Sequence, residues 1–457
     1  MASYLAGLAE LCVTPTLGGM MPGQFHQRWG TGVLDELFVK ALVIENTVAN
    51  ASVNAAARVS ANTAADAGRI AIVAVDCLGL RDDIHEAFQK KLAARTGIEN
   101  ALFAATHTHS GGPVDSWGDH LTDDKNYIGF LIDKSVDAVV LALNNMRPAV
   151  LRAGREREAD ISFNRRYYMK DGGLRTNPGV GNPDIVKPAG PIDPDVTVLR
   201  IDDLNGNVIG AVTNFACHLD TVGGDRICAD YPGELSRQLK NIYGQNVISL
   251  FLTAPCGNIN HIDVSGKLPS AGEHYKRMGR VIAGKAVAAL EKAPAMPTDA
   301  LKAIRADIEC ACRIPSRGDM EAGRALVARE KRTNAELLAA GDGSLQDLFY
   351  AKEAVRMYNN PQASARLSIF AYRIGDLAVV TAPAELFVEF SLDIKESFAP
   401  GYIMISSLSN GMVGYVVTRD ALESGGYESR LCSSSKMSGD AGHMIADAAK
   451  SLLKTLF

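Results

Sequence analysis

The stretch IAIVAVDCLGL (residues 70–80), followed by RDDIHEAFQKKLAARTG (81–97) and LFAAT (102–106), decides the fold class. The outer two segments are apolar runs of strand length, and the segment between them has helical spacing and ends on a glycine. This order predicts a sheet that is covered by helices. The sequence HTHSGG follows at once, so the second strand opens into a glycine-rich loop.

The same alternation continues along the chain. VTVLRID (196–202) and NVIGAVTNFAC (207–217) are strand patterns, and the turn sequence DLNG (203–206) predicts that they form a hairpin. VISLFLTAPCG (247–257) gives another strand, and the pattern over 125–149 predicts an amphipathic helix that Pro148 stops. We therefore expect a mixed α/β (α+β) fold in which helices cover mixed β-sheets.

The chain shows no internal repeat and no low-complexity segment, and its length of 457 residues allows one large domain or two or three average ones. A charged stretch at about 316–359, rich in Ala, Glu, Arg and Lys, predicts helices within it. Residues 164–195 are rich in glycine and proline and predict a long, irregular and functional loop.

Composition limits the classes of protein that the chain can belong to. Hydrophobic residues make up 47% and charged residues 22%, which is ordinary for a soluble globular protein. The net charge of −5 argues against a nucleic acid or an acidic membrane as partner. Eight scattered cysteines without a CxxC pair favour reduced thiols, and the start lacks the basic region of a signal peptide. We expect a cytoplasmic protein with a small-molecule substrate, and a homo-oligomer stays open.

Residues able to bind a metal recur where predicted strands end. His107 and His109 point to the same side of an extended chain, His218 follows NFAC, Glu385 follows VVTAPA, and Tyr415 lies in SNGMVGY. A catalytic zinc takes nitrogen, oxygen or sulfur ligands and keeps one position for water. Each residue also has a purely structural interpretation: surface histidines on a loop, a satisfied buried histidine, a carboxylate at a helix start and a half-buried tyrosine. The recurrence at strand ends is what indicates a site.

Taken in order, these segments resemble the neutral (non-lysosomal) ceramidase family and its bacterial catalytic domains. ATHTHSGGP resembles the THTHSGPGG signature of that family, NFACHLD resembles its FAxH strand, and APAELF resembles its PGEFT segment. Further segments match in the same order: AGLAELCVTP, GTGVLDELFVKALVIEN, IVAVDCLGL, FNRRYY, PCGNINH and SNGMVGYVVT. The resemblance covers nearly the whole chain. It implies a single ceramidase-like catalytic domain over residues 1–457, without the family's C-terminal immunoglobulin-like domain.

The resemblance also implies roles for individual residues. It implies one zinc ion per chain with four ligands: His107, His218, Glu385 and Tyr415. His109 would then move protons, and Arg165 or Tyr415 would stabilise the oxyanion. Such a ligand set would bring the pKa of a zinc-bound water toward neutrality.

One departure from the family pattern lies in the turn Gly257–His261. Asn258 and Asn260 occupy the aspartate and serine positions of the family's G-D-x-S-P turn. Because an amide is no nucleophile, zinc-bound water is the expected attacking group rather than a serine. We expect four residues to contact the substrate: His26, Arg166, Asn258 and Asn260.

The expected function is a zinc-dependent hydrolase that cleaves an amide, or a related ester or lactone, of a small polar substrate. Four cations near the N-R motif favour a substrate with a carboxylate: Arg165, Arg166, Lys170 and Arg175. Two alternatives stay open. The protein could be a true ceramidase acting on N-acyl sphingosine, or a non-catalytic homologue that binds zinc or a ligand.

Rival enzyme classes fit the sequence less well. A metallo-β-lactamase motif HxHxDH would need an aspartate and a third histidine after His109, where Ser-Gly-Gly stands instead. An amidohydrolase barrel would need eight regular βα units and a later set of ligands that the chain does not display. A nucleophilic cysteine, Cys217 or Cys256, would need a base and a lowered pKa.

Overall fold

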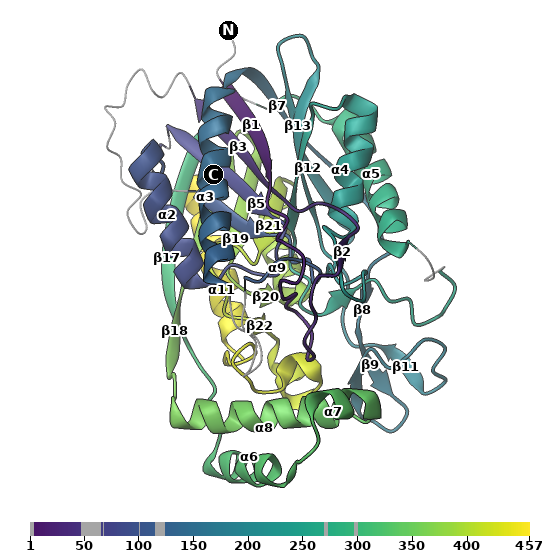
Figure 1. The fold of residues 1–457 in the computed structure, drawn as a ribbon. Helices are drawn as coiled ribbons and strands as arrows, with labels where there is room; N and C mark the ends of the chain where they lie inside the picture. The colour runs from purple at the N-terminus through teal and green to yellow at the C-terminus, as the bar shows by residue number, and fades with distance from the viewer. Residues whose placement is uncertain are drawn as a thin grey trace.

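The computed structural model of the chain describes residues 4–46, 65–66, 68–99, 101–114, 124–268, 273–296 and 300–457. Two mixed β-sheets pack face to face, and helices cover their outer faces (Figure 1). The expected mixed α/β class is confirmed. The assignment of the whole chain to one domain stays a prediction.

The larger sheet has the strand order β15-β13-β12-β7-β1-β3-β5-β6. Its strands are β1 Tyr4–Cys12, β3 Phe38–Asn46, β5 Arg69–Val75, β6 Ala101–Ala105, β7 Arg147–Arg157, β12 Asp195–Asp202, β13 Val208–Phe215 and β15 Ile248–Thr253. β5 pairs with β6 in parallel through helix α2 (Asp82–Thr96), and β13 pairs with β15 in parallel through α4 (Tyr231–Tyr243). The antiparallel pairing of β12 with β13 confirms the hairpin at residues 203–206.

The smaller sheet has the strand order β21-β19-β18-β17-β4. Its strands are β4 Ala65–Asp66, β17 Leu301–Ala311, β18 Ser364–Ile374, β19 Leu377–Ala382 and β21 Tyr402–Ser407. β19 and β21 are parallel and are joined through α9 (Val388–Phe398). Leu42 and Leu102 of the larger sheet and Phe370 and Met404 of the smaller one belong to a single core between the sheets.

Three further helices complete the outer layers. α3 (Lys125–Asn144) packs with α2 on one part of the larger sheet, and α5 (His274–Lys292) packs with α4 on another. α11 (Ala441–Leu456) covers the smaller sheet beside α9. Apolar residues at helical spacing, such as Ile445, Ala449 and Leu452, explain why one stripe of α11 is buried.

Two sequence expectations are wrong in part. The helix expected over 125–149 ends at Asn144, and strand β7 begins at Arg147. Pro148 lies near the start of that strand, where it pairs with Leu5 of β1, and a proline cannot continue a helix. The alternation of buried Leu151 and Ala153 with less buried neighbours is a strand pattern that the preceding helical period masks.

The region 164–195 is more ordered than an irregular loop. It forms a three-stranded sheet of β9 (Arg166–Met169), β10 (Leu174–Thr176) and β11 (Ile185–Pro188). Just before it, β8 (Phe163–Asn164) pairs with β16 (Ile259–Asn260). Short strands with few apolar residues give little periodicity, so the glycines and prolines of the turns dominated the prediction.

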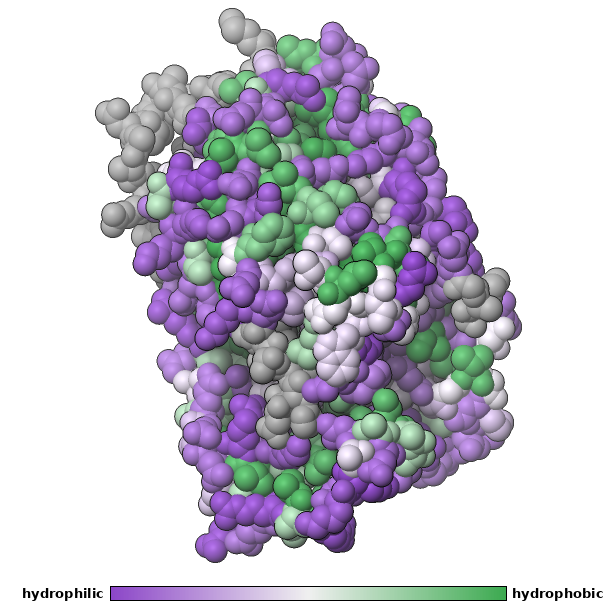
Figure 2. Space-filling model, in the orientation of Figure 1, coloured by the Kyte–Doolittle hydropathy of each residue, from purple (hydrophilic) through white to green (hydrophobic). Residues whose placement is uncertain are grey.

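The charged stretch at 316–359 forms helices α6 (Arg317–Arg329), α7 (Asn334–Ala340) and α8 (Ser344–Asn359), as predicted. α8 runs across one end of the molecule in Figure 1, with α6 beyond it. The face shown in Figure 2 is mostly hydrophilic, with hydrophobic side chains in small separate groups. Among the described helices, none combines the length and hydrophobicity that a membrane span requires.

Candidate metal centre

The ends of parallel strands position the candidate ligands. His107 and His109 follow β6, His218 follows β13, and Glu385 follows β19 in strand β20 (Glu385–Leu386). β20 pairs in parallel with β22 (Tyr415–Val416), so Glu385 and Tyr415 are direct partners in the ladder. The carboxyl ends of neighbouring parallel strands meet at one edge, which is the usual place for a site in α/β proteins.

The backbone of the histidine loop is held in an uncommon conformation. His107 has a φ of 74°, in the left-handed region. Its amide donates to the Cys77 carbonyl at 2.9 Å, and the amide of His109 donates to the Leu219 carbonyl at 3.0 Å. A non-glycine residue at positive φ costs free energy and persists only where the surrounding structure fixes it. The loop is thus a preformed support for both rings.

All three imidazole rings use Nδ1 in the same way. Each Nδ1 lies within hydrogen-bond distance of a backbone carbonyl: Leu78 at 2.6 Å for His107, Cys256 at 2.8 Å for His218 and Gly23 at 2.9 Å for His109. A carbonyl only accepts, so each Nδ1 must carry the proton. In a neutral ring Nε2 then presents a lone pair, and this arrangement is typical of metal-binding histidines.

The Nε2 atoms converge on the carboxylate of Glu385. Its Oε2 lies 3.4 Å from Nε2 of His107 and 3.3 Å from Nε2 of His218. Nε2 of His109 lies 3.4 Å from Nε2 of His107. Oε2 of Glu385 and Nε2 of His218 are both buried without a hydrogen-bond partner. Four acceptor atoms therefore face one another with no donor between them.

This arrangement fits a metal cation. One ligand nitrogen from each of His107, His109 and His218 lies within 4.8 Å of the others, in a buried group. A tetrahedral zinc with bonds of about 2.0–2.1 Å places its ligands about 3.3 Å apart, close to the separations from Glu385 to His107 and His218. Buried lone pairs without donors are costly, and a cation would satisfy all of them.

The directions of three pKa shifts agree with a metal site, whereas that of His107 favours a proton on Nε2 shared with Glu385. Burial lowers the pKa of His109 to about 3, with the charge of His107 acting in the same direction. Burial and the charge of Arg165 lower the pKa of His218. Burial also lowers the pKa of His107, but contact with Glu385 outweighs it and the pKa is raised. Burial opposes ionisation of Glu385, yet its contacts with His107 and His218 hold its pKa well below the ordinary value.

Arg165 is fixed beside Tyr415. Its Nη2 donates to the Tyr415 hydroxyl at 3.0 Å and to the Gly257 carbonyl at 2.6 Å, and its Nε donates to Glu428 at 2.8 Å. The guanidinium also lies over the rings of Tyr415 and Tyr427, at 5.6 and 5.7 Å from their centres. Burial raises the pKa of the Tyr415 phenol, and the charge of Arg165 acts against that rise.

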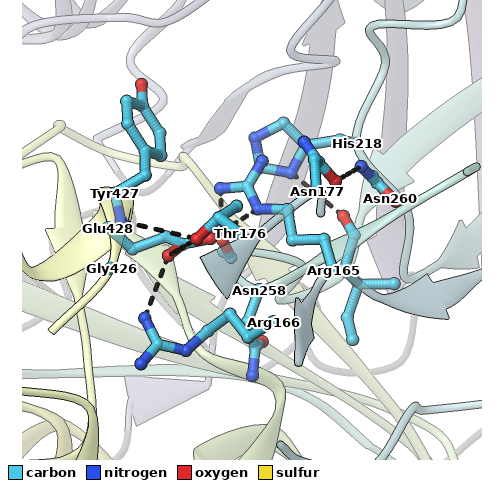
Figure 3. A network of polar contacts seen from close by, with 12 residues as sticks. Arg165, Arg166, Thr176, Asn177, His218, Asn258, Asn260, Gly426, Tyr427 and Glu428 are labelled. Carbon is cyan, nitrogen blue, oxygen red and sulfur yellow. Dashed lines mark hydrogen bonds and ion pairs between the residues drawn. The ribbon is translucent and has the colours of Figure 1, made fainter. Parts of the chain in front are cut away.

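Glu428 organises a second polar group, which we call the Glu428 cluster: Glu428, Arg165, Arg166 and Thr176. Figure 3 shows the Glu428 carboxylate between the two arginines. Arg166 donates to it at 3.0 Å and the Thr176 hydroxyl at 2.9 Å, and Glu428 is fully buried. Burial opposes ionisation of Glu428, but Arg165 and Arg166 lower its pKa. Every charge in this cluster therefore has a partner.

The four cations that were expected to bind a substrate carboxylate do not form one unpaired group. Arg165 and Arg166 are both paired with Glu428, and Arg175 is paired with Asp171 at 2.9 Å. Lys170 lies 3.9 Å from Asp184 on the exposed side of the small sheet. The sequence shows cations close together but not the distant Glu428 that neutralises two of them.

The two asparagines of the 257–261 turn are bonded to protein groups. The Asn258 amide donates to Glu389 at 2.8 Å, and its oxygen accepts from the Val388 amide. The Asn260 amide donates to Asn177 at 2.8 Å, as Figure 3 shows. Both side chains hold neighbouring segments in place, and their contact with substrate stays a prediction.

The N-terminal loop reaches the centre from another side. Gly23 supplies the carbonyl that contacts His109, and a Cβ at Gly23 would lie 2.8 Å from Nδ1 of that ring. Arg28 is buried and donates to the carbonyls of His109 and Pro22. His26 is half-buried on the same loop, and its contact with substrate also stays a prediction.

Sequence reasoning missed three residues at this site. Arg28, Tyr427 and Glu428 lie in segments without strand-end or motif signals, and only the folded chain brings them here. The two cysteines beside the site are not activated, because burial raises the pKa of Cys217 and Cys256. Neither is present as the thiolate that nucleophilic attack requires.

No protein-family model matches the chain. The chain is similar to the crystal structure of neutral ceramidase from Pseudomonas aeruginosa, with 20% identity and a TM-score of 0.73 over 100% of this chain and 75% of that chain. A structure of ceramidase complexed with C2 gives 19% identity and a TM-score of 0.73 over 100% and 76% of the two chains. The chain therefore has the ceramidase-like fold that its motifs predicted.

Proposed function

We propose that the protein is a zinc-dependent hydrolase that uses water to cleave an amide bond, or a related ester or lactone bond. The observation that carries this proposal is the set of buried acceptor atoms on His107, His109, His218 and Glu385, which has no donor of its own. A proton on His107 would satisfy only part of this set, whereas a metal cation would satisfy all of its acceptors at once.

His107, His218, Glu385 and Tyr415 would hold one zinc ion. When bound, zinc would act as a Lewis acid that lowers the pKa of a water ligand and polarises the scissile carbonyl. Tyr415 is included because its ladder pairing sets it beside Glu385. Arg165 supports it as a ligand, since its guanidinium donates to the Tyr415 oxygen.

His109 is proposed to carry protons for the reaction rather than to hold the metal. Its Nδ1 is committed to the Gly23 carbonyl, which leaves Nε2 to receive a proton from water and to return it to the leaving amine. Arg165 and Tyr415 would place positive charge and a donor near the developing oxyanion.

Attack by a serine is not part of the proposal. Asn260 takes the place of the family's serine, is fully buried, and has its amide and its oxygen bonded to Asn177 and Ile262. Water is the remaining nucleophile among the groups at this site. A carboxylate anchor is also left out, because Arg165 and Arg166 are already paired with Glu428.

Two alternatives follow from specific observations. The solved structures that share this fold are ceramidases, which favours N-acyl sphingosine as a substrate. The asparagines at positions 258 and 260 favour a protein that keeps the pocket without turnover. The long-chain alternative requires an extended apolar channel, and the compact alternative does not.

One experiment separates these functions. Zinc-loaded protein is assayed side by side on short-chain ceramide, compact amides, esters and lactones, and its metal content is measured by elemental analysis. We expect hydrolysis of compact amides, about one zinc per chain, and loss of both in His218→Ala. His443→Ala, a change at an exposed histidine on α11, is the matched control and should keep both. Full zinc occupancy in His218→Ala would contradict the metal site, and zinc without any turnover would favour the non-catalytic alternative.

A further inference from the structure

A pocket of about 460 Å³ opens where three distant parts of the chain meet. Phe25 comes from the N-terminal loop, Tyr350 from α8, and Tyr427 from the short 3-10 helix Tyr427–Ser429. Figure 1 shows the N-terminal loop extending toward the end of the molecule where α8 lies. The volume is within the range of small-molecule sites.

Aromatic rings build the walls of this pocket. The Phe25 ring lies 5.3 Å from Phe349 and 6.0 Å from both Tyr350 and Tyr427. Its contacts with Phe349 and Tyr427 are edge-to-face, at 75° and 81°. Phe25 also packs on the apolar cluster that Leu337 of α7 forms with residues of α8. The rings are thus held in place before any ligand arrives.

Two of these rings connect the pocket to the metal centre. The Tyr427 ring lies 5.6 Å from the ring of Tyr415, at 78°, and close to the guanidinium of Arg165. Phe25 is two residues from Gly23, whose carbonyl contacts His109. A molecule that lies against Phe25 and Tyr427 is therefore one side chain away from the proposed reacting atoms.

The other lining residues are small, aliphatic or polar. Gly425 and Gly426 line the pocket without side chains, Leu422 adds an aliphatic one, and Arg430 is exposed at the rim. The Arg430 guanidinium lies 3.9 Å from the centre of the Tyr350 ring and donates to Asp347 at 2.8 Å. This pair places charge beside one of the aromatic walls, which suits a compact ring better than a long alkyl chain.

On the basis of the proposed hydrolase function, we propose that this pocket binds an aromatic ring that the substrate carries next to its scissile amide. Aromatic walls in edge-to-face contact complement the face and the edge of a planar ring. The substrate class is then compact aryl amides rather than long-chain N-acyl sphingosines. Tyr350 and Phe25 would determine specificity, and they take no part in the chemical step.

The first test measures binding and does not depend on turnover. Benzamide, cyclohexanecarboxamide and acetamide are titrated against zinc-loaded protein by ligand-observed NMR. We expect benzamide to bind most tightly and Tyr350→Leu to weaken it about 2- to 10-fold, which corresponds to the usual worth of one aromatic contact. Phe398→Leu removes a ring that packs on Phe457 instead, and this control should bind benzamide like the wild type.

Because Tyr350→Leu changes a buried residue and could affect folding, a second variant at an exposed position tests the same pocket. Gln346 is exposed at the edge of the pocket, so Gln346→Trp should fold normally and fill the space. We expect it to weaken benzamide binding while leaving the zinc content unchanged. Equal benzamide affinity in wild type, Tyr350→Leu and Gln346→Trp would overturn the proposal.

A kinetic experiment tests the pocket assignment and the proposed hydrolase function independently. Benzoyl, cyclohexanecarbonyl and acetyl amides of one amine are compared by kcat/KM in wild type and Tyr350→Leu. We expect only the benzoyl preference to fall, about 2- to 10-fold. If none of the amides is hydrolysed, the amide-cleaving part of the proposed function is refuted, and benzamide binding alone then tests the pocket. A larger effect of Tyr350→Leu on short-chain ceramide than on the benzoyl amide would overturn the aromatic assignment.

Discussion

The candidate metal centre and the Glu428 cluster are two largely buried polar groups joined by Arg165, and they are built in opposite ways. At the metal centre, Glu385 and the histidine Nε2 atoms are acceptors without donors. In the Glu428 cluster, one carboxylate accepts from two arginines and a hydroxyl, so donors and acceptors match. Each group is buried except for one half-buried member, His109 and Thr176, so exposure does not explain the difference.

The balance of donors and acceptors indicates which of the two polar groups binds a ligand. A buried cluster whose donors and acceptors balance is satisfied by the protein alone and has a structural role. A buried cluster of acceptors is complete only with something positive. Arg165 has one end in each group, so the balanced cluster fixes the guanidinium that contacts Tyr415 at the unbalanced one.

Removing the carboxylate of the metal centre should have the largest effect. Glu385→Ala is expected to lower zinc affinity at least about 100-fold, because loss of even an outer-sphere partner costs 10- to 100-fold. Competition with a coloured chelator measures the affinity. Glu389→Ala is the matched control. This nearby carboxylate lies on α9 and contacts Asn258 rather than the histidines. Equal zinc affinity in both variants would contradict the site.

His109→Ala tests the division of labour within the histidine group. We expect the variant to keep its zinc and to lose about 10²- to 10⁴-fold in kcat, the usual contribution of a positioned acid or base. Elemental analysis and steady-state kinetics on the same sample measure both quantities. Loss of zinc to the extent seen in His107→Ala would make His109 a ligand instead.

Glu428→Ala should destabilise the fold more than removal of an ordinary buried carboxylate. It leaves two buried arginines without their anion, and breaking such a pair costs about 3–5 kcal/mol. Glu353 is the matched control: it is also buried, but its partner Arg356 is 51% exposed, so we expect about 1 kcal/mol. Urea unfolding of both variants with saturating zinc gives the free energies of unfolding. Equal losses of unfolding free energy in the two variants would contradict the view that Glu428 is stabilising because it neutralises two buried arginines.

Zinc should stabilise the folded chain, because the acceptor group is complete only with a cation. At a free zinc concentration of 100 times Kd, the free energy of unfolding should rise by about 2.7 kcal/mol. Thermal unfolding with zinc and with excess chelator measures the difference. Glu385→Ala should show much less of it at the same concentration, and a full response there would place the stabilising ion elsewhere.

Asn260→Ser should have the smallest effect. The change restores the family's serine but removes the amide that donates to Asn177, at a cost of about 1 kcal/mol. We expect kcat to stay within about tenfold of wild type, because water is the proposed nucleophile. An acyl-enzyme detected by mass spectrometry, together with a large gain in rate, would show that the position can act as a nucleophile.

Much of the fold and part of the site followed from local sequence signals. The strands at 70–75 and 101–105 and the helix between them were readable because each keeps one period over several residues. His107, His218 and Glu385 were found because polar residues that directly follow apolar strands stand out. Strand β7 and the small sheet β9–β11 were missed because a proline or a run of turn residues outweighs a short strand period.

The sequence by itself determined the residue types at the candidate site, the strand ends that present them and the likeness to the ceramidase fold. Only the tertiary structure decided that Glu428 neutralises Arg165 and Arg166, and that Phe25 meets α8 and Tyr427 beside the centre. Periodicity reports how a segment packs against its neighbours along the chain. Partners that lie more than 250 positions apart, such as Arg165 and Glu428, leave no local pattern, because their contact is created by the folding of the whole chain.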